Sequence, residues 1–415
     1  MTVISELRMR PASTEGWAWD ASVTARLVVS GIVLFVLLVG ANLATPLYPL
    51  LQAHLGLSSF DVTVAFTSYV LALIGTLLVA GHWSDHIGRR AAMVLAVLVS
   101  FAGGLVFAFA GNLLMLSAGR ALQGAAVALA TGACSAALRE LLPLRPEWAS
   151  RFTLLASSGG VAAGPVIGGL LSLFPHPVST PFLVQAGILA ALLVPLWMIR
   201  ARPAIKHIEH GYGLEALAPR RPQISREARG AFWMASMVGF LSFTVFGFCL
   251  SLAPAYFAPV VHADSRPLVG LLAGLTLGAS AVSQLMRAEG KFRVSTGLTV
   301  LGVSVAAMAF AAAANAPWLL VFACIAAGAG QGIAFRTVFN TVANKVEPAR
   351  HAQIISGVYV ITYLGSAIPV LGLGWAAGYF GLAASVAVFA GACLVVALVL
   401  AAFAFRSELR EARAA

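Results

Sequence analysis

The stretch GHWSDHIGRR, Gly81 to Arg90, concentrates charge in a chain that carries very little of it. Apolar segments of about twenty residues flank it on both sides, which is the length of helix that crosses a bilayer. Of the 415 residues, 60% are hydrophobic and 10% are charged, whereas ordinary soluble domains are about 25% charged. A soluble core could not bury this much apolar surface. The composition therefore predicts an integral membrane protein in which this charged stretch joins two membrane spans.

Apolar windows between polar breaks divide the chain into twelve predicted helices. They cover residues 27–50, 58–80, 91–110, 113–136, 149–173, 181–200, 231–257, 267–286, 294–314, 317–341, 352–376 and 381–405. A long, Pro-bearing polar break with seven Lys or Arg separates the sixth helix from the seventh. We therefore expect an all-α protein with two similar six-helix bundles. The expected parts are an N-terminal tail (1–26), a first bundle (27–200), a central loop (201–229), a second bundle (230–406) and a C-terminal tail (407–415).

The basic residues predict how these helices are oriented. If the N-terminus is cytoplasmic, 23 of the 26 Lys and Arg fall in inner loops and tails, the exceptions being Arg120, Arg266 and Arg336. Because Lys and Arg are enriched in cytoplasmic loops, we expect both termini in the cytoplasm and a location in the plasma membrane. The net charge of +11 would then face anionic lipid headgroups, and no basic module for nucleic acid is predicted.

The two halves of the chain repeat weakly, in order, at offsets between 204 and 208 residues. The three matched pairs are TPLYP (Thr45–Pro49) with APAYF (Ala253–Phe257), QG (Gln123–Gly124) with QG (Gln331–Gly332), and GPVIGG (Gly164–Gly169) with IPVLGLG (Ile368–Gly374). Each pair falls on equivalent predicted spans. Two six-helix halves duplicated in parallel are the architecture of a transporter whose halves rock against each other.

The charged stretch between the second and third spans has the composition of a gate at the inner surface. Gly81 and Gly88 permit a tight reversal of the chain, and Asp85 can accept hydrogen bonds from a helix N-terminus or from Arg. A charge cluster at an interface that opens and closes favours one state over the other. Arg89 and Arg90 taken alone would be anchors at the membrane surface. The candidate gate consists of Gly81, Asp85, Gly88, Arg89, Arg90 and, from the end of the fourth span, Glu140.

The same stretch resembles the loop signature of the major facilitator superfamily, Gly-x-Leu-x-Asp-Arg-x-Gly-Arg-Arg/Lys. It departs from that signature at Trp83 and His86. Three further segments resemble the proton-antiporter branch of the superfamily: Gly40, Pro46 and Pro49 in the first span, Leu116, Arg120, Gln123 and Gly124 in the fourth, and Gly160, Gly164, Pro165, Gly168 and Gly169 in the fifth. The resemblance implies a twelve-helix carrier that exports a small organic solute or drug in exchange for protons, with no other cofactor.

The fifth predicted span presents glycine every fourth residue, at Gly160, Gly164 and Gly168. One stripe of this helix therefore lacks side chains, and a neighbouring helix can approach closely. Pro165 bends or stiffens the helix at this point. The close contact is either permanent or made in one transport state and broken in the other.

Ionisable residues inside membrane spans are candidate functional residues, because burying a charge in lipid is costly. Arg120 would meet a substrate or pair helices together, and Arg336 would do the same or extend to the inner surface. Asp61 is either the proton carrier or a helix cap. The candidate substrate and proton pathway consists of Arg120, Gln123, Asn42, Asp61, Tyr48, Gln331, Arg336, Asn340 and Tyr256, with Tyr69, Gln185, Tyr359 and Tyr363 as further lining residues. Such a lining suits a polar neutral solute, or an anion that meets Arg120.

Two functions remain open from the sequence. The first is proton-coupled efflux of a small organic solute by alternating access, and the second is uptake or facilitated diffusion without a proton. An enzyme would show a nucleophile–base pair or a metal cluster near one face, and the four scattered Cys have no metal-ligand spacing. We therefore expect a carrier, acting as a monomer in the lipid bilayer on a small-molecule substrate.

Overall fold

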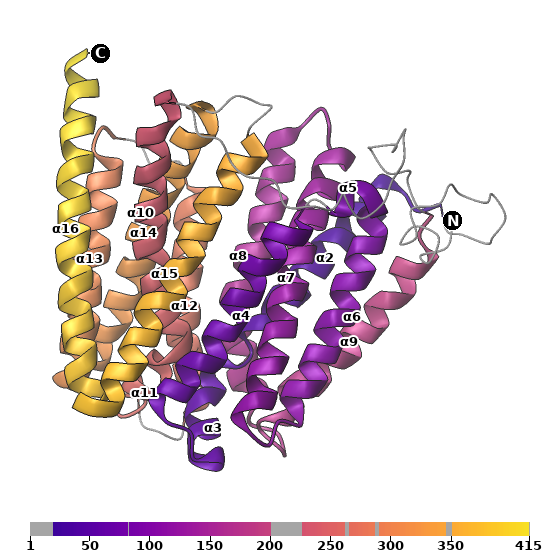
Figure 1. The fold of residues 1–415 in the computed structure, drawn as a ribbon, viewed down its shortest axis with the longest axis horizontal. Coiled ribbons are helices and arrows are strands. Elements are labelled where there is room, and N and C mark those ends of the chain that lie inside the picture. The colour runs from indigo at the N-terminus through magenta and orange to yellow at the C-terminus, as the bar shows by residue number, and fades with distance from the viewer. Residues whose placement is uncertain are drawn as a thin grey trace.

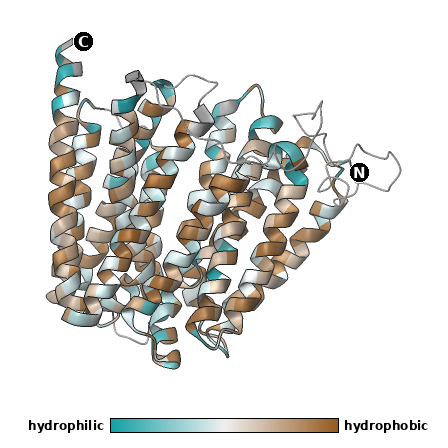
Figure 2. Ribbon diagram, viewed as in Figure 1, coloured by the Kyte–Doolittle hydropathy of each residue, from teal (hydrophilic) through white to brown (hydrophobic). Residues whose placement is uncertain are grey.

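The computed structural model describes residues 20–81, 83–200, 226–261, 265–286, 290–345 and 351–414. Within those residues, twelve helices are long and apolar enough to cross a membrane. Figure 1 shows them side by side in two groups, with α3 and α11 at the lower edge and α5 and the end of α16 at the upper edge. Hydrophobic residues dominate the middle of the helices and polar residues gather toward the upper edge (Figure 2). We refer to these two edges as the α3 side and the α5 side.

The helices of each half follow one another in the same order. The first half contains α2 (Val23–Asn42), η1 (Thr45–Leu47), α3 (Tyr48–Leu55), α4 (Ser59–Ala80), α5 (Trp83–Ile87), α6 (Arg89–Ala108), α7 (Leu113–Leu141), α8 (Pro146–Leu171) and α9 (Ser179–Met198). The second half contains α10 (Arg226–Ser251), α11 (Ala253–Phe257), α12 (Arg266–Leu285), α13 (Arg293–Ala313), α14 (Pro317–Lys345), α15 (His351–Phe380) and α16 (Leu382–Ala414).

Two predicted helices, 27–50 and 231–257, are each broken near the α3 side rather than continuous. Pro46 and Pro49 occupy the first turns of η1 and α3, and Pro254 occupies the first turn of α11. Proline has no N–H to donate and its ring clashes with the preceding turn, so a helix ends before it and a new one begins. The repeat between TPLYP and APAYF therefore marks the same helix break in both halves.

The packing pattern is repeated between the halves. Helix α7 packs against α2, α4 and α6, and helix α14 packs against α10, α12 and α13. A side chain at Gly124 of α7 would place its Cβ 2.1 Å from the backbone oxygen of Tyr69, and one at Gly332 of α14 would place it 2.5 Å from that of Ser280. Both repeated QG pairs thus mark a helix contact that only glycine permits. The fold is two pseudo-symmetric six-helix bundles.

The bundles meet through two helix pairs, α8 with α12 and α4 with α15. A Cβ on Gly270 of α12 would lie 2.2 Å from the backbone oxygen of Pro165, and one on Gly374 of α15 would lie 2.3 Å from Thr63 Oγ1. Both contacts lie between the middle of the helices and the α3 side. The two bundles are therefore tightly packed over that half of their shared surface.

Most of the segment expected as a C-terminal tail, 407–415, is helical. Helix α16 continues through it as far as Ala414. Glu408 Oε1 accepts a hydrogen bond from the backbone N–H of Val294 at 2.8 Å, and its Oε2 accepts one from Ser295 Oγ at 2.6 Å. A carboxylate at a helix N-terminus satisfies unpaired N–H groups and complements the helix dipole. The segment therefore caps α13. The tail expected at 1–26 and the loop expected at 201–229 lie largely outside the described residues.

Candidate substrate pathway and gate

Arg120 lies inside the first bundle and is 2% exposed. Its Nη1 donates hydrogen bonds to the backbone oxygen of Ala41 at 2.5 Å and to Gln123 Oε1 at 2.8 Å. Its guanidinium lies over the ring of Tyr69, 4.6 Å from the centroid. Arg120 and Gln123 are three residues apart on α7, which places them on one face of that helix. The guanidinium thus joins α2, α4 and α7 at the centre of the bundle.

The positive charge of Arg120 has only neutral partners among the residues that the structure describes, where no carboxylate pairs with it. Three buried polar atoms around it are also without a hydrogen-bond partner: Arg120 Nε, Gln123 Nε2 and Tyr48 Oη. Tyr48 and Tyr69 both lie within electrostatic range of Arg120. Buried polar groups normally find partners, because each one left unpaired costs free energy. The site is therefore positively charged and retains unused donors.

Two further candidates of the first bundle have structural partners. Asn42 Nδ2 donates to the backbone oxygen of Leu38 at 2.8 Å, and a Cβ on Gly164 would lie 2.5 Å from Asn42 Cβ. Asp61 and Ser58 form a capping box at the start of α4, in which Asp61 Oδ2 accepts hydrogen bonds from the backbone N–H and the Oγ of Ser58, each at 2.8 Å. The structure therefore places Asp61 in a helix cap, the second of the roles weighed from the sequence.

The candidates of the second bundle bind within that bundle. Ser280 Oγ donates to Gln331 Oε1. Arg336 Nη1 donates to the backbone oxygen of Met286 at 2.7 Å, at the end of α12, and Tyr256 Oη donates to that of Ala309 at 3.0 Å. Asn340 is exposed near the α5 side. Arg120, Gln123 and Tyr48 thus form one group, whereas Gln331, Arg336 and Tyr256 make their contacts within the second bundle. Asp61 and Asn340 belong to neither group.

An aromatic cluster in the second bundle was only partly predicted. Its neighbouring ring centroids are 5.1 to 6.3 Å apart. Tyr363 packs, with Tyr69 of the first bundle, against the apolar contact between α4 and α15. The two tyrosines were predicted from the sequence as lining residues, and the three phenylalanines were not. Phe335 and Phe339 lie four residues apart, which places them on one helix face. We define the aromatic cluster as Phe243, Phe335, Phe339, Tyr359 and Tyr363.

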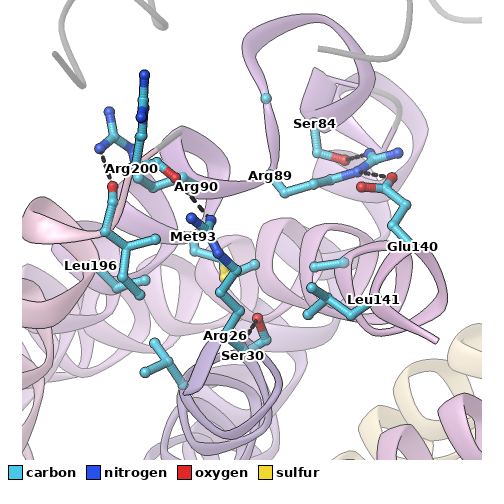
Figure 3. Close-up of a pocket in the computed structure, with 14 residues that line it drawn as sticks. Arg26, Ser30, Ser84, Arg89, Arg90, Met93, Glu140, Leu141, Leu196 and Arg200 are labelled. Atoms are coloured by element: carbon cyan, nitrogen blue, oxygen red, sulfur yellow. Dashed lines mark hydrogen bonds and ion pairs between the residues drawn. The ribbon is translucent and has the colours of Figure 1, made fainter. Parts of the chain in front are cut away.

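Four of the six predicted gate residues, Gly88, Arg89, Arg90 and Glu140, line a cavity of about 80 Å³ at the α5 side (Figure 3). Arg89 Nη1 pairs with Asp85 Oδ1 at 2.5 Å, and Arg89 Nε pairs with Glu140 Oε1 at 2.8 Å. Arg90 Nη1 donates to the backbone oxygen of Ile199 at 2.5 Å. Arg89 therefore ties α5 and α6 to α7, and Arg90 ties α6 to the end of α9.

The two gate glycines differ in their backbone conformation. Gly88 has a φ of 90°, which L-residues rarely adopt, and it precedes the first residue of α6. Gly81 ends α4 with a φ of −58°, which any residue can adopt. The reversal predicted for this stretch thus depends on Gly88. The stretch also contains the short helix α5, which was not predicted from the sequence.

The glycines of α8 make close contacts on two sides. A Cβ would lie 2.6 Å from the backbone oxygen of Phe35 at Gly160 and 2.4 Å from that of Leu43 at Gly168, both on α2 or directly after it. At Gly169 it would lie 2.9 Å from the backbone oxygen of Arg266, the first residue of α12. One face of helix α8 therefore packs closely against α2 of its own bundle, and a second face packs closely against α12 of the other bundle.

The described residues form twelve spans in two similar bundles, with a buried polar site in one bundle and a charged cluster at one edge. These features are typical of a multi-pass membrane transporter. The family model of the Major Facilitator Superfamily matches residues 31–368, and the chain belongs to that superfamily. Its members are transporters rather than enzymes, and they act on small-molecule substrates in a lipid bilayer.

Curated relatives match parts of the chain. An uncharacterized MFS-type transporter of Mycobacterium tuberculosis is 25% identical over 175 residues, which cover 41% of this chain and 25% of the relative. The bacillibactin exporter of Bacillus subtilis is 30% identical over 73 residues, or 18% of each protein. The matches thus span a quarter or less of these relatives' length.

Solved structures match nearly the whole chain. A bacterial homolog of the human lysosomal transporter Spinster, in an inward-facing and unoccupied conformation, has a TM-score of 0.74 at 16% identity and covers 94% of this chain and 98% of its own. A nucleoside transporter has a TM-score of 0.70 at 12% identity and covers 92% of this chain and 99% of its own. At such identities the match concerns the fold alone.

Proposed function

We propose that this transporter exports a small organic solute across the plasma membrane in exchange for protons, by alternating access between its two bundles. The glycine stripe of α8 supports the antiporter assignment, because it lies both against α2 and against α12 of the other bundle. The similarity to the bacillibactin exporter supports the outward direction. The proposal places both termini in the cytoplasm, in line with the distribution of basic residues.

The observation that carries the proposal is the buried polar site at Arg120. A guanidinium with unused donors in the middle of a membrane bundle is costly unless it serves a ligand. The site adjoins Tyr69, which lies where α4 meets α15 of the other bundle. The close packing of the bundles toward the α3 side supports an inward-facing state in this proposal, in which the α5 side is cytoplasmic.

One observation favours a second candidate function, facilitated transport without a proton. Over the ranges that the structure describes, no carboxylate pairs with Arg120, and Asp61 is engaged with Ser58 in the capping box. A proton carrier in the membrane centre would be expected to titrate beside the substrate site. In the coupled mechanism, the carboxylates that carry the proton are Asp61, or Asp85 and Glu140 of the gate.

The two functions separate in proteoliposomes under an imposed pH gradient. A growth screen of cells with and without the protein, over antibiotics, sugars and nucleosides, supplies transported solutes. For the coupled exporter, each solute dissipates the pH gradient in liposomes that contain the protein and leaves it intact in empty ones. Asp61→Asn removes this signal if Asp61 carries the proton. Solute movement with no proton flux in the wild-type protein would establish the uncoupled carrier instead.

The orientation is tested separately with single cysteines. The four native cysteines are buried, and Phe174 and Leu144 are exposed on the α3 and α5 sides, respectively. In intact cells we expect a membrane-impermeant maleimide to label Phe174→Cys and not Leu144→Cys, and both to be labelled after lysis. Labelling of Leu144→Cys alone in intact cells would reverse the proposed topology.

A further inference from the structure

The charge at the centre of the first bundle is fixed. The guanidinium of arginine stays protonated in proteins, so Arg120 carries its charge at every physiological pH. Its three partners are a backbone oxygen, an amide oxygen and an aromatic ring, all of them formally neutral. A buried cation without a counter-charge is strongly unfavourable. Within the described part of the chain no acidic side chain supplies that charge.

The unused donors around Arg120 are suited to an anion. Arg120 Nε, Gln123 Nε2 and Tyr48 Oη are all buried, each on a side chain that is at most 2% exposed, and each can donate a hydrogen bond. They come from two elements, α7 and α3. Donors from arginine, amide and phenol groups bind carboxylates, and charge-assisted hydrogen bonds of this kind are the strong ones. An amine would meet like charge here and no acceptor of opposite charge.

The surface beyond Tyr69 is aromatic rather than charged. The ring of Tyr69 faces Arg120 on one side, and Tyr69 packs with Tyr363 in the contact between the two bundles. Tyr363 meets Phe243 edge-on at 5.1 Å, and Phe335, Phe339 and Tyr359 continue the cluster. Aromatic side chains favour other aromatic rings in stacked or edge-to-face arrangements. A ligand that bridges the bundles would therefore place a charged group in one and an apolar ring in the other.

We propose that the substrate is an aromatic organic anion, whose carboxylate or equivalent group binds at Arg120, Gln123 and Tyr48 and whose ring binds the aromatic cluster. The inference rests on the proposed function in that the site is taken as a transport site, and it adds the class of substrate. The anion supplies the counter-charge that the described residues lack. It also accepts hydrogen bonds from the three donors that are without partners.

The test compares four probes on the purified protein by calorimetry. They are 3-phenylpropionate, its neutral amide 3-phenylpropionamide, the cation 3-phenylpropylamine, and the non-aromatic anion hexanoate. We expect 3-phenylpropionate to bind at least about tenfold more tightly than the amide or the amine, since one tenfold step corresponds to a single strong polar contact. We expect it to bind about fivefold more tightly than hexanoate.

Variants show which residues cause each preference, the polar site for the anionic group and the aromatic cluster for the ring. Arg120→Gln is expected to abolish the preference for the anion over the amide, and Arg120→Lys to retain part of it. Tyr363→Leu is expected to reduce the preference for the ring and leave the preference for the charge. Arg139→Gln is the matched control, because Arg139 is exposed near the α5 side and lies outside the polar site. Monodispersity and thermal unfolding show whether each variant is folded, and the wild-type comparison stands without any variant.

The outcomes distinguish the inference from the proposed function. Three results would each overturn the inference. The wild-type protein binds the amide or the amine as tightly as 3-phenylpropionate or more tightly, it fails to bind 3-phenylpropionate at millimolar concentration, or the folded Arg120→Gln variant keeps the wild-type selectivity. If the proteoliposomes still transport neutral or cationic solutes in that case, the proposed function stands and only the substrate class is wrong. If no solute from the growth screen is transported, the transport function itself fails.

Discussion

At the scale of single residues, a few side chains hold together segments that are distant in the sequence. Arg120 joins three helices of the first bundle through its two hydrogen bonds and its contact with Tyr69. Arg89 joins α5 and α6 to α7 by two ion pairs. In a membrane, where apolar surfaces are equally well solvated by lipid, such polar contacts and close packing determine which helices associate.

Replacing Arg89 tests whether the charged cluster controls transport. Arg89→Gln removes the ion pairs with Asp85 and Glu140, and Glu140→Gln removes one of them. Because these pairs are partly exposed, we expect less than about 1 kcal/mol of lost stability. The transport rate in proteoliposomes should fall about tenfold, which is 1.4 kcal/mol in the balance between states. Arg139→Gln is the control, since Arg139 is exposed and donates to the backbone oxygen of Ser135 on its own helix. An Arg89→Gln variant that transports at the wild-type rate would exclude a gating role.

Replacing Gly88 tests the tight reversal before α6. Gly88 has φ 90° and ψ 152°, a region that is essentially restricted to glycine. Gly88→Ala is therefore expected to cost about 1–3 kcal/mol of stability, although nothing lies within 4 Å of the position where its Cβ would be. Gly187→Ala is the matched control, because Gly187 is helical and equally open. Thermal unfolding in detergent measures both, and an unchanged midpoint for Gly88→Ala would show that the strain is relieved elsewhere.

Residue roles could be predicted only in part from the sequence. Arg120 and Gln123 were both named as pathway residues from the sequence, and the structure adds that Arg120 donates a hydrogen bond to Gln123. The role of Asp61 was open between proton carrier and cap, because both require an acid near a helix start. Its hydrogen bonds with Ser58 are visible only in three dimensions. The aromatic cluster combines rings from α10, α14 and α15, which no local sequence window contains.

At the scale of helices, the spans were predicted to within a few residues, and the differences have identifiable causes. Windows of hydropathy do not register a proline break inside an apolar run, so the breaks before α3 and α11 were missed. The continuation of α16 beyond residue 406 was missed because its last turns are charged. Its stability comes from a tertiary contact, the bonds from Glu408 to the start of α13.

Replacing Glu408 tests that contact. Glu408→Ala leaves the N–H groups at the start of α13 without their acceptor, and loss of a helix cap costs about 1 kcal/mol. We expect a lower thermal unfolding midpoint and faster amide hydrogen exchange at the start of α13. Arg410→Ala serves as the control, since Arg410 is exposed on the same helix. Equal exchange in both variants would mean that Glu408 contributes nothing to the cap.

At the scale of the whole molecule, two bundles share one surface, formed by α8 with α12 and α4 with α15. The internal repeat predicted this duplicated architecture, although its three motifs are short. Each motif marks a constrained position, either a helix break or a contact that only glycine permits. The sequence contained no comparable signal for which side of the shared surface is closed. That depends on packing between segments about 100 residues apart, as in the contact of Gly270 with Pro165.

Enlarging Gly270 tests whether the α8–α12 contact separates during transport. Gly270→Leu inserts a side chain where even a Cβ would lie 2.2 Å from the backbone oxygen of Pro165. We expect it to disfavour the closed α3 side and to reduce transport at least about tenfold, since overpacking a tight contact costs about 1–3 kcal/mol. Gly391→Leu is the control, because nothing lies within 4 Å of that position. Normal transport by Gly270→Leu would indicate that this contact is not part of the cycle.

Spin-label distances in nanodiscs can show whether the two bundles rock about a shared site. One pair, Phe174 with Trp318, spans the bundles on the α3 side, and the other, Leu144 with Met286, spans them on the α5 side; all four residues are exposed. We expect two populations for each pair when a transported solute or a pH change is applied, with the α3-side distance increasing as the α5-side distance decreases. Distances that stay single and fixed under every condition, or that increase together, would contradict the rocking motion.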